Sequence, residues 1–266
     1  MPNTFLDARD RWLDLSEIDY LGHFVRAWLA LNAWYRSAYA DPQDRVIVDN
    51  LKWQPNPIRS KHLPLVSAAT AEGAELRANI GLLHERLENY RIEVGKGADK
   101  KPISFGNVYL QSRQMPAQSS NYQNWNYEVK AGAVNGSVQA SATDRNGNVR
   151  YLLAQNKYDL AGLDSDPAFA ANLNATQQGR LRSLYVDYAP RLVADVSQRR
   201  VAGFREFQLG AVVFACPPEE LFAATVEISY QMRCALFHGE LIPTKDATAC
   251  YEPAYRIVRQ FLAAIT

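Results

Sequence analysis

The chain has 266 residues, of which 47% are hydrophobic and 21% are charged. These are ordinary values for a globular protein, and they exclude an intrinsically disordered chain, a collagen and a coiled-coil rod. The 29 lysines and arginines and the 28 aspartates and glutamates leave a net charge of +1. Without a strong positive field over its whole surface, the protein would have to hold an anionic partner through a local patch. The length predicts one domain, or one domain with a sizeable insertion.

The cysteines and the apolar segments predict a cytoplasmic protein. Cys216, Cys234 and Cys250 are too few for a disulfide framework and suit a reducing compartment. Residues 1–15 carry too many charges for the apolar part of a signal peptide. The apolar stretch 207–218 is shorter than the roughly 20 residues that a membrane-spanning helix needs. We therefore expect no membrane association.

Two long helices are predicted in the first third of the chain, over residues 18–39 and 69–90. In both, apolar residues recur every three or four positions, which is typical of a helix with one buried face. Residues 42–68 contain four prolines and are predicted to be an irregular connection. Asn32 lies on the apolar face of the first helix, where a buried amide needs a partner. The favoured interpretation is a hydrogen bond to a neighbouring helix, and the alternative is a supporting role in a functional site.

The middle of the chain is predicted to be a small antiparallel sheet inserted between helices, over residues 103–156. Asn-Gly pairs at 135–136 and 146–147 are typical of tight hairpin turns. The polar segment 111–126 is predicted to be a loop. The predicted strands are residues 103–110, 127–134, 137–144 and 149–153.

Aromatic and basic residues occur together in this insertion. Tyr122, Trp125 and Tyr127 lie near Arg113 and Lys130 in the sequence, and Tyr109 precedes them. Aromatic side chains beside basic ones can stack on unpaired bases. They are also ordinary residues of a sheet, which is the favoured interpretation.

Helices are predicted again after residue 157. One ends near Tyr188, one begins at Pro217 and ends at Gly239, and a last one covers about 253–264. Between residues 177 and 206 there are six arginines and three acidic residues. This stretch is either a solvated helix face or an anion-binding patch. The predicted fold is α+β: a helical bundle of residues 1–102 and 157–266 with the sheet of 103–156 inserted.

Most signatures of enzymes are missing from the sequence. It contains no GxSxG, HExxH, CxxC or GxGxxG motif. No two of the histidines His23, His62, His84 and His238 have the spacing of metal ligands. We therefore expect neither a metal nor a cofactor.

Arg233 and His238 are the candidate catalytic residues, because they occur at the end of an otherwise apolar helix. A buried guanidinium requires a carboxylate, an anion or a cleft. Histidine is the usual acid–base group near neutral pH. Together they suit cleavage of RNA without a metal, in which His238 moves a proton and Arg233 stabilises the negative charge on phosphorus. An arginine and a histidine at this spacing are common by chance.

The segment Arg233-Cys-Ala-Leu-Phe-His238-Gly239 resembles the motif of the HEPN family, an arginine followed after four to six residues by a histidine. The helix Phe24-Val-Arg-Ala-Trp28-Leu-Ala-Leu-Asn32-Ala-Trp-Tyr35 is similar to the opening helix of that family. The resemblance covers the helical parts and leaves out the sheet. The family usually has a polar residue, often asparagine, where this chain has Cys234.

The resemblance implies a helical bundle that is often a dimer. It implies a metal-independent endoribonuclease with Arg233 and His238 as its catalytic pair. Family members act in toxin–antitoxin and antiphage systems, so an antitoxin or another defence partner is expected as well as RNA. Inactive RNA-binding members exist, and the alternative is therefore a non-catalytic module that binds RNA or a protein. A small-molecule enzyme with a cleft near Asn32 is a third and weaker alternative.

Overall fold

The computed structural model describes residues 9 and 13 and the ranges 18–95, 100–112, 115–134, 136–197, 206–210 and 212–266. Some predicted features fall outside these residues: most of the N-terminal segment 1–15, Arg113, the turn residue Asn135, and three arginines of the basic stretch, at 199, 200 and 205. The chain folds into two compact units. Unit 1 comprises 1–110 and 193–266, and unit 2 comprises 111–192.

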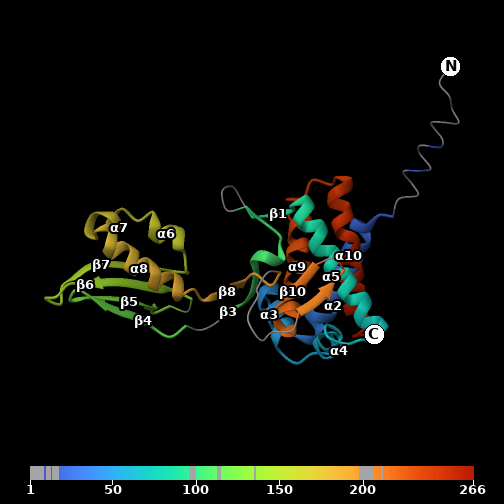
Figure 1. Ribbon diagram of the computed structural model, residues 1–266, viewed down its shortest axis with the longest axis horizontal. Helices are drawn as coiled ribbons and strands as arrows, with labels where there is room; N and C mark the ends of the chain where they lie inside the picture. Colours follow the sequence, from blue (N-terminus) through green and yellow to red (C-terminus); the bar gives the residue numbers. More distant parts are fainter. Residues whose placement is uncertain are drawn as a thin grey trace, which may run out of the picture. The chain divides into compact units, whose positions relative to one another are not determined.

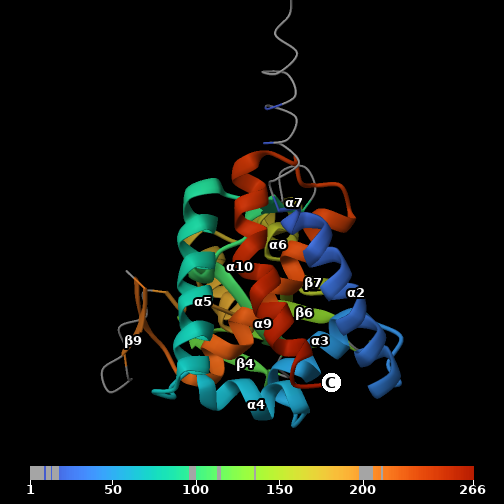
Figure 2. The ribbon, with the colours of Figure 1, turned by 90° about the vertical axis from the view of Figure 1, so that its right-hand side faces the viewer.

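Unit 1 is built mainly from helices. Its helices are α2 (Tyr20–Ala38), α3 (Asp44–Trp53), α4 (Pro57–Leu65), α5 (Ala71–Tyr90), α9 (Pro218–Phe237) and α10 (Lys245–Leu262). Figure 2 shows α10 between α2 and α5, and α10 packs on both of them. The predicted helices over 18–39 and 69–90 are confirmed as α2 and α5.

The prediction of an irregular connection over 42–68 is wrong, because α3 and α4 occupy it. Pro57 is the first residue of α4, where a missing N–H costs nothing, and the Asn56 side chain caps the helix. Pro64 is the next-to-last residue of the same helix. These prolines therefore mark the ends of a helix and do not exclude one.

The last helix begins earlier than predicted, at Lys245, and Pro253 lies inside it. A proline within a helix leaves the carbonyl four residues earlier without its N–H partner. Here that carbonyl belongs to Ala249, and the Arg86 guanidinium of α5 donates to it. The side chain of Thr244 caps the true start of α10 by accepting from the Ala247 N–H.

Short strands complete unit 1 and join it to unit 2. β1 (Glu93–Val94) pairs with β2 (Lys101–Pro102), and β9 (Glu206–Leu209) pairs with β10 (Val212–Ala215), both antiparallel. A 3-10 turn, η2, covers Phe105–Asn107. The chain passes between the units along β3 (Val108–Ser112) and β8 (Arg191–Ala194), which pair with each other.

Unit 2 contains an antiparallel sheet with the order β4-β5-β6-β7 (Figure 1). The strands are β4 (Gln118–Tyr122), β5 (Trp125–Ala131), β6 (Val138–Thr143) and β7 (Val149–Gln155). The predicted strands beginning at 127, 137 and 149 are confirmed. The prediction of a loop over 111–126 is wrong, because β4 lies in it and pairs with β5 from Gln118↔Val129 to Tyr122↔Trp125.

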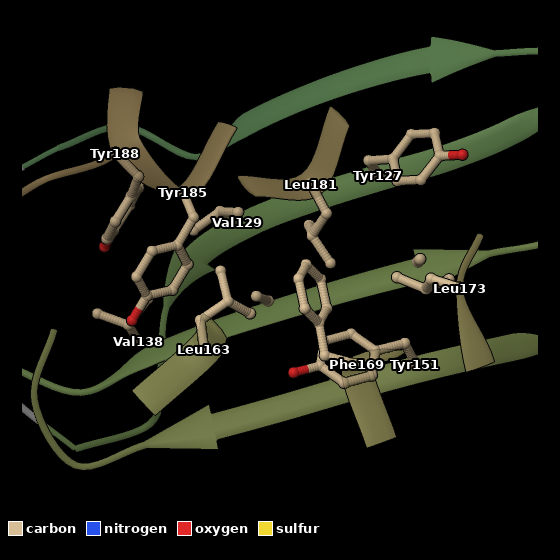
Figure 3. Packing of buried hydrophobic residues seen from close by; sticks show 12 residues of the cluster. Tyr127, Val129, Val138, Tyr151, Leu163, Phe169, Leu173, Leu181, Tyr185 and Tyr188 are labelled. Atoms are coloured by element: carbon tan, nitrogen blue, oxygen red, sulfur yellow. The ribbon is translucent and has the colours of Figure 1, made fainter. Parts of the chain in front are cut away.

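The helices α6 (Leu160–Asp164), α7 (Pro167–Asn172) and α8 (Ala175–Asp187) belong to unit 2. Figure 3 shows their side chains Leu163, Phe169 and Leu181 packed on side chains of the sheet. The compact unit therefore extends beyond the predicted insertion 103–156. One face of the sheet needs a cover, and the next helices along the chain provide it.

Tyr127 does not provide a stacking platform for bases. It is fully buried in the core between the sheet and α8. Tyr122 and Trp125 pack against the same core, and the guanidinium carbon of Arg180 lies over the Tyr122 ring, 4.3 Å from its centroid. The interpretation as ordinary residues of a sheet is the one that the packing supports.

The described residues thus form a mixed α+β structure with antiparallel sheets. No helix in the described ranges is both long and apolar enough to cross a membrane.

Candidate functional site

Helix α9 carries the predicted motif, and its sequence fixes both of its ends. Pro218 is its first residue, and Glu219 and Glu220 lie in the first turn, where negative charge is favourable. At the other end Gly239 has a positive φ of 67°, which is easy for glycine. The Glu240 N–H donates to the Ala235 carbonyl, and the Gly239 N–H donates to the Leu236 carbonyl. This is the Schellman arrangement, and it makes His238 the C-cap of α9.

Arg233 lies in the next-to-last turn of α9, and its side chain is 18% exposed. Its Nη2 is 3.6 Å from Oδ2 of Asp44, the first residue of α3. Its guanidinium carbon lies 4.9 Å from the centroid of the Phe237 ring. The only hydrogen bond of its side chain to the described residues goes to the Cys234 sulfur, at 3.9 Å, and its Nε is buried without a partner there. Within the described residues its donors therefore form no hydrogen bond to an oxygen, and Asp44 is held only as an ion pair.

His238 has a different environment. It is exposed at the end of α9, and its backbone N–H donates to the Cys234 carbonyl. Its imidazole forms no hydrogen bond or ring contact with any residue that the structure describes. No hydrogen bond, ion pair or ring contact within the described chain joins it to Arg233. The two predicted catalytic residues thus share one helix end without a bond between their side chains.

Asn32 is half-buried in α2 and makes no side-chain hydrogen bond within the described ranges, so the expected bond to a neighbouring helix is not formed. Its neighbours on the same face, one turn away on each side, are Trp28 and Tyr35. The Trp28 ring lies 6.2 Å from the ring of Tyr230 on α9. Tyr35 is fully buried, and the charges of Asp44 and Arg233 both act on its hydroxyl. Asn32 therefore lies on the face of α2 that turns toward the motif.

Sequence reasoning missed a second polar group, which lies where α9 contacts α3. We call it the Glu227 cluster, and it consists of Glu227 on α9 and of Arg45, Asp49 and Lys52 on α3. Glu227 is 1% exposed, and Arg45 donates to both of its oxygens, at 3.0 and 2.5 Å. Lys52 is fully buried and lies 3.0 Å from Glu227 and 2.7 Å from Asp49. The cluster joins α3 to α9. Glu227 is separated from the other three members by about 180 residues of sequence, so no local pattern indicates the cluster.

Burial alone would raise the pKa of Glu227. The hydrogen bond from Arg45 and the positive charges of Lys52 and Arg45 outweigh burial and lower that pKa below its ordinary value. Glu227 is therefore ionised near neutral pH. Each charge in the cluster has an opposite charge within hydrogen-bond distance, which is the arrangement expected of a structural ion network.

The cysteines and the possible metal ligands of the described residues form no further candidate site. Cys216, Cys234 and Cys250 form no disulfide bond with one another. Within the described ranges no three His, Cys, Asp or Glu side chains are grouped so that they could hold a metal ion. The chain matches no family model, no curated protein and no solved structure.

Proposed function

We propose that the protein is a metal-independent endoribonuclease of the HEPN type, with Arg233 and His238 as its catalytic pair. One observation carries the proposal: α9 ends in an arginine with unmet hydrogen-bond donors and, five residues later, an exposed histidine, neither of which is satisfied by an oxygen of the described residues. Elsewhere on the same helix the Glu227 carboxylate is bonded to Arg45 and Lys52 of α3, although the Nε of Arg45, like that of Arg233, is buried without a partner among the described residues. Unmet donors at one end of a well-packed helix are typical of a binding or catalytic site.

The reaction needs what this pair supplies. In the cleavage of RNA, the 2′-oxygen attacks phosphorus and the bond from phosphorus to the 5′-oxygen breaks. One proton leaves the 2′-hydroxyl, another reaches the 5′-oxygen, and the products are a 2′,3′-cyclic phosphate and a 5′-hydroxyl. His238 would carry one of these protons, since imidazole exchanges protons near neutral pH. Arg233 would bind the phosphate and stabilise the charge that grows on it.

The positions of the two residues favour a site shared by two chains. Five residues along a helix correspond to a rotation of roughly 500°, a net offset of about 140°, and to a rise of about 7.5 Å. Two copies related by a two-fold axis would place Arg233 of one copy beside His238 of the other. We therefore propose a homodimer, whose mass light scattering would show at micromolar concentration.

Mixing two inactive variants tests the shared site. A dimer of one Arg233→Ala chain and one His238→Ala chain retains one intact shared site. Unfolding and refolding the mixture should therefore restore part of the wild-type cleavage. If each site lies within one chain, the mixture stays as inactive as its components, and the shared site is wrong.

Incubation of the purified wild-type protein with total RNA in EDTA tests the activity itself. We expect fragments in EDTA at the same rate as in Mg²⁺. Cleavage only in Mg²⁺, or none in either condition, would contradict the proposal.

A second candidate is a non-catalytic HEPN module that binds RNA or a partner protein, such as another component of a defence system. The observation that favours it is the ion pair between Arg233 and Asp44, because it reduces the charge that a substrate meets. RNA binding by a protein that cleaves no RNA would support this candidate.

A further inference from the structure

Asp44 is the only carboxylate that contacts Arg233 in the described part of the chain, and the motif does not include it. Its position is fixed from two directions. It is the first residue of α3, where a negative charge is favoured by the helix dipole. On its other side the Arg36 guanidinium of α2 contacts Oδ1, and Arg36 itself is held by the Pro42 carbonyl at 2.8 Å.

Tyr35 lies on the buried side of this carboxylate. It is fully buried, and its hydroxyl forms no hydrogen bond of standard geometry with the described residues, although the Asp44 carboxylate is close enough to act on it. Burial and the negative charge of Asp44 raise the pKa of Tyr35 to about 12. Tyr35 thus stays neutral at physiological pH and adds no charge to the site. Arg36, Asp44 and Arg233 together then carry one net positive charge.

The length of the contact between Asp44 and Arg233 is informative. At 3.6 Å the carboxylate attracts the guanidinium but does not form a short hydrogen bond with it. The opposite case is Arg45, whose two terminal nitrogens both donate to Glu227. The terminal N–H groups of Arg45 are therefore occupied by Glu227. Asp44 orients Arg233, whose terminal N–H groups are kept for another oxygen acceptor.

We infer that Asp44 is a positioning residue for Arg233: it holds the guanidinium at the end of α9 with its N–H groups free for a phosphate of the RNA. This inference rests on the proposed function. An arginine that is already ordered loses less side-chain freedom when it binds a phosphate. Asp44 acts only through Arg233 and does not touch the reacting atoms.

The first test measures the order of Arg233 without using cleavage. The ¹⁵N heteronuclear NOE of the Arg233 Nε–H is recorded in wild type and in Asp44→Asn. The signal of Arg233 is identified as the one that is missing from the spectrum of Arg233→Lys. We expect an ordered Arg233 in wild type and a mobile one in Asp44→Asn. The internal control is Arg182, which pairs with Asp164 in unit 2 and should not change. An equally ordered Arg233 in both proteins overturns the inference, whether or not RNA is cleaved.

The second test uses kinetics. Asp44→Asn should lower kcat about tenfold and leave KM within threefold, because the negative charge that opposes RNA is lost together with the orientation. Asp44→Glu, which keeps a carboxylate, should recover most of that loss. An unchanged kcat in Asp44→Asn, or no recovery in Asp44→Glu, counts against positioning. If Arg233 becomes mobile but wild type cleaves no RNA, the proposed function fails and the positioning of Arg233 stands.

Discussion

Helix α9 carries two polar groups that differ in one respect. In its middle, Glu227 is buried beside the buried Lys52 of α3, and each charge of the Glu227 cluster is paired within hydrogen-bond distance. At its end, the terminal nitrogens of Arg233 form no hydrogen bond to an oxygen of the described residues, and the exposed imidazole of His238 has no hydrogen-bond partner among them. Both groups contact or face α3, so packing between the same helices does not explain the difference. The comparison suggests that the first group supports the fold and that the second is kept available for a ligand.

The largest effect should come from His238. If it is the acid–base group, His238→Ala should lower the rate of RNA cleavage by roughly two to four orders of magnitude. The free energy of unfolding should not change, because the imidazole is exposed and makes no contact with the described chain. Single-turnover cleavage and urea unfolding measure the two effects. If the free energy of unfolding fell while the cleavage rate did not change, His238 would support the fold and not the reaction.

Glu227→Ala should have the opposite profile. It removes one of the two carboxylates beside the buried Lys52, which keeps Asp49 at 2.7 Å, and breaking a buried pair costs up to about 3–5 kcal/mol. We expect the free energy of unfolding to fall by that amount in urea titrations. A change below about 1 kcal/mol would mean that the cluster does not support the fold.

A matched pair of conservative substitutions sharpens the contrast. Lysine keeps the charge of arginine but loses the two-pronged hydrogen bonding. Arg45→Lys should lower the free energy of unfolding by about 1.5–3 kcal/mol, the value of a hydrogen bond between charged groups, and leave cleavage unchanged. Arg233→Lys should leave unfolding unchanged and abolish most cleavage. If both variants changed the free energy of unfolding and the cleavage rate to the same extent, Arg45 and Arg233 would not differ in role.

The smallest effect concerns acid. The pKa of Glu227 is lowered in the folded protein, so its ionised form contributes stability above its ordinary pKa of 4.5, and this contribution disappears as the pH falls through the folded value. Below pH 4.5 wild type should therefore lose stability faster than Glu227→Gln, by at most about 1.4 kcal/mol per pH unit. Unfolding midpoints from pH 6 to pH 3 give the two slopes. Parallel slopes would show that Glu227 does not titrate with folding.

Local patterns in the sequence predict much of α9. Pro218 with the two glutamates after it indicates the start, and Gly239 indicates the end. The pairing of Arg233 with Asp44 could not be predicted, because it depends on how α3 packs on α9. The same holds for Arg86, whose guanidinium allows Pro253 to lie inside α10.

Unit 2 shows a similar limit. The turn at Gly147 and the alternation of buried residues in β6 could be predicted from the sequence. That α6, α7 and α8 belong to unit 2 could not be predicted, since a helix that follows a sheet can pack on that sheet or return to the helical bundle. The outcome depends on contacts such as Leu163 and Leu181 against the sheet, which local periodicity does not reveal.

The chemistry at the end of α9 is tested most directly by the ends of the RNA that the protein produces. A synthetic RNA of defined sequence is incubated with wild type in EDTA, and the fragments are weighed by mass spectrometry. If His238 and Arg233 promote attack by the 2′-oxygen, the upstream fragments end in a 2′,3′-cyclic phosphate and the downstream fragments begin with a 5′-hydroxyl. Fragments with a 3′-hydroxyl and a 5′-phosphate would contradict the account, as would intact RNA.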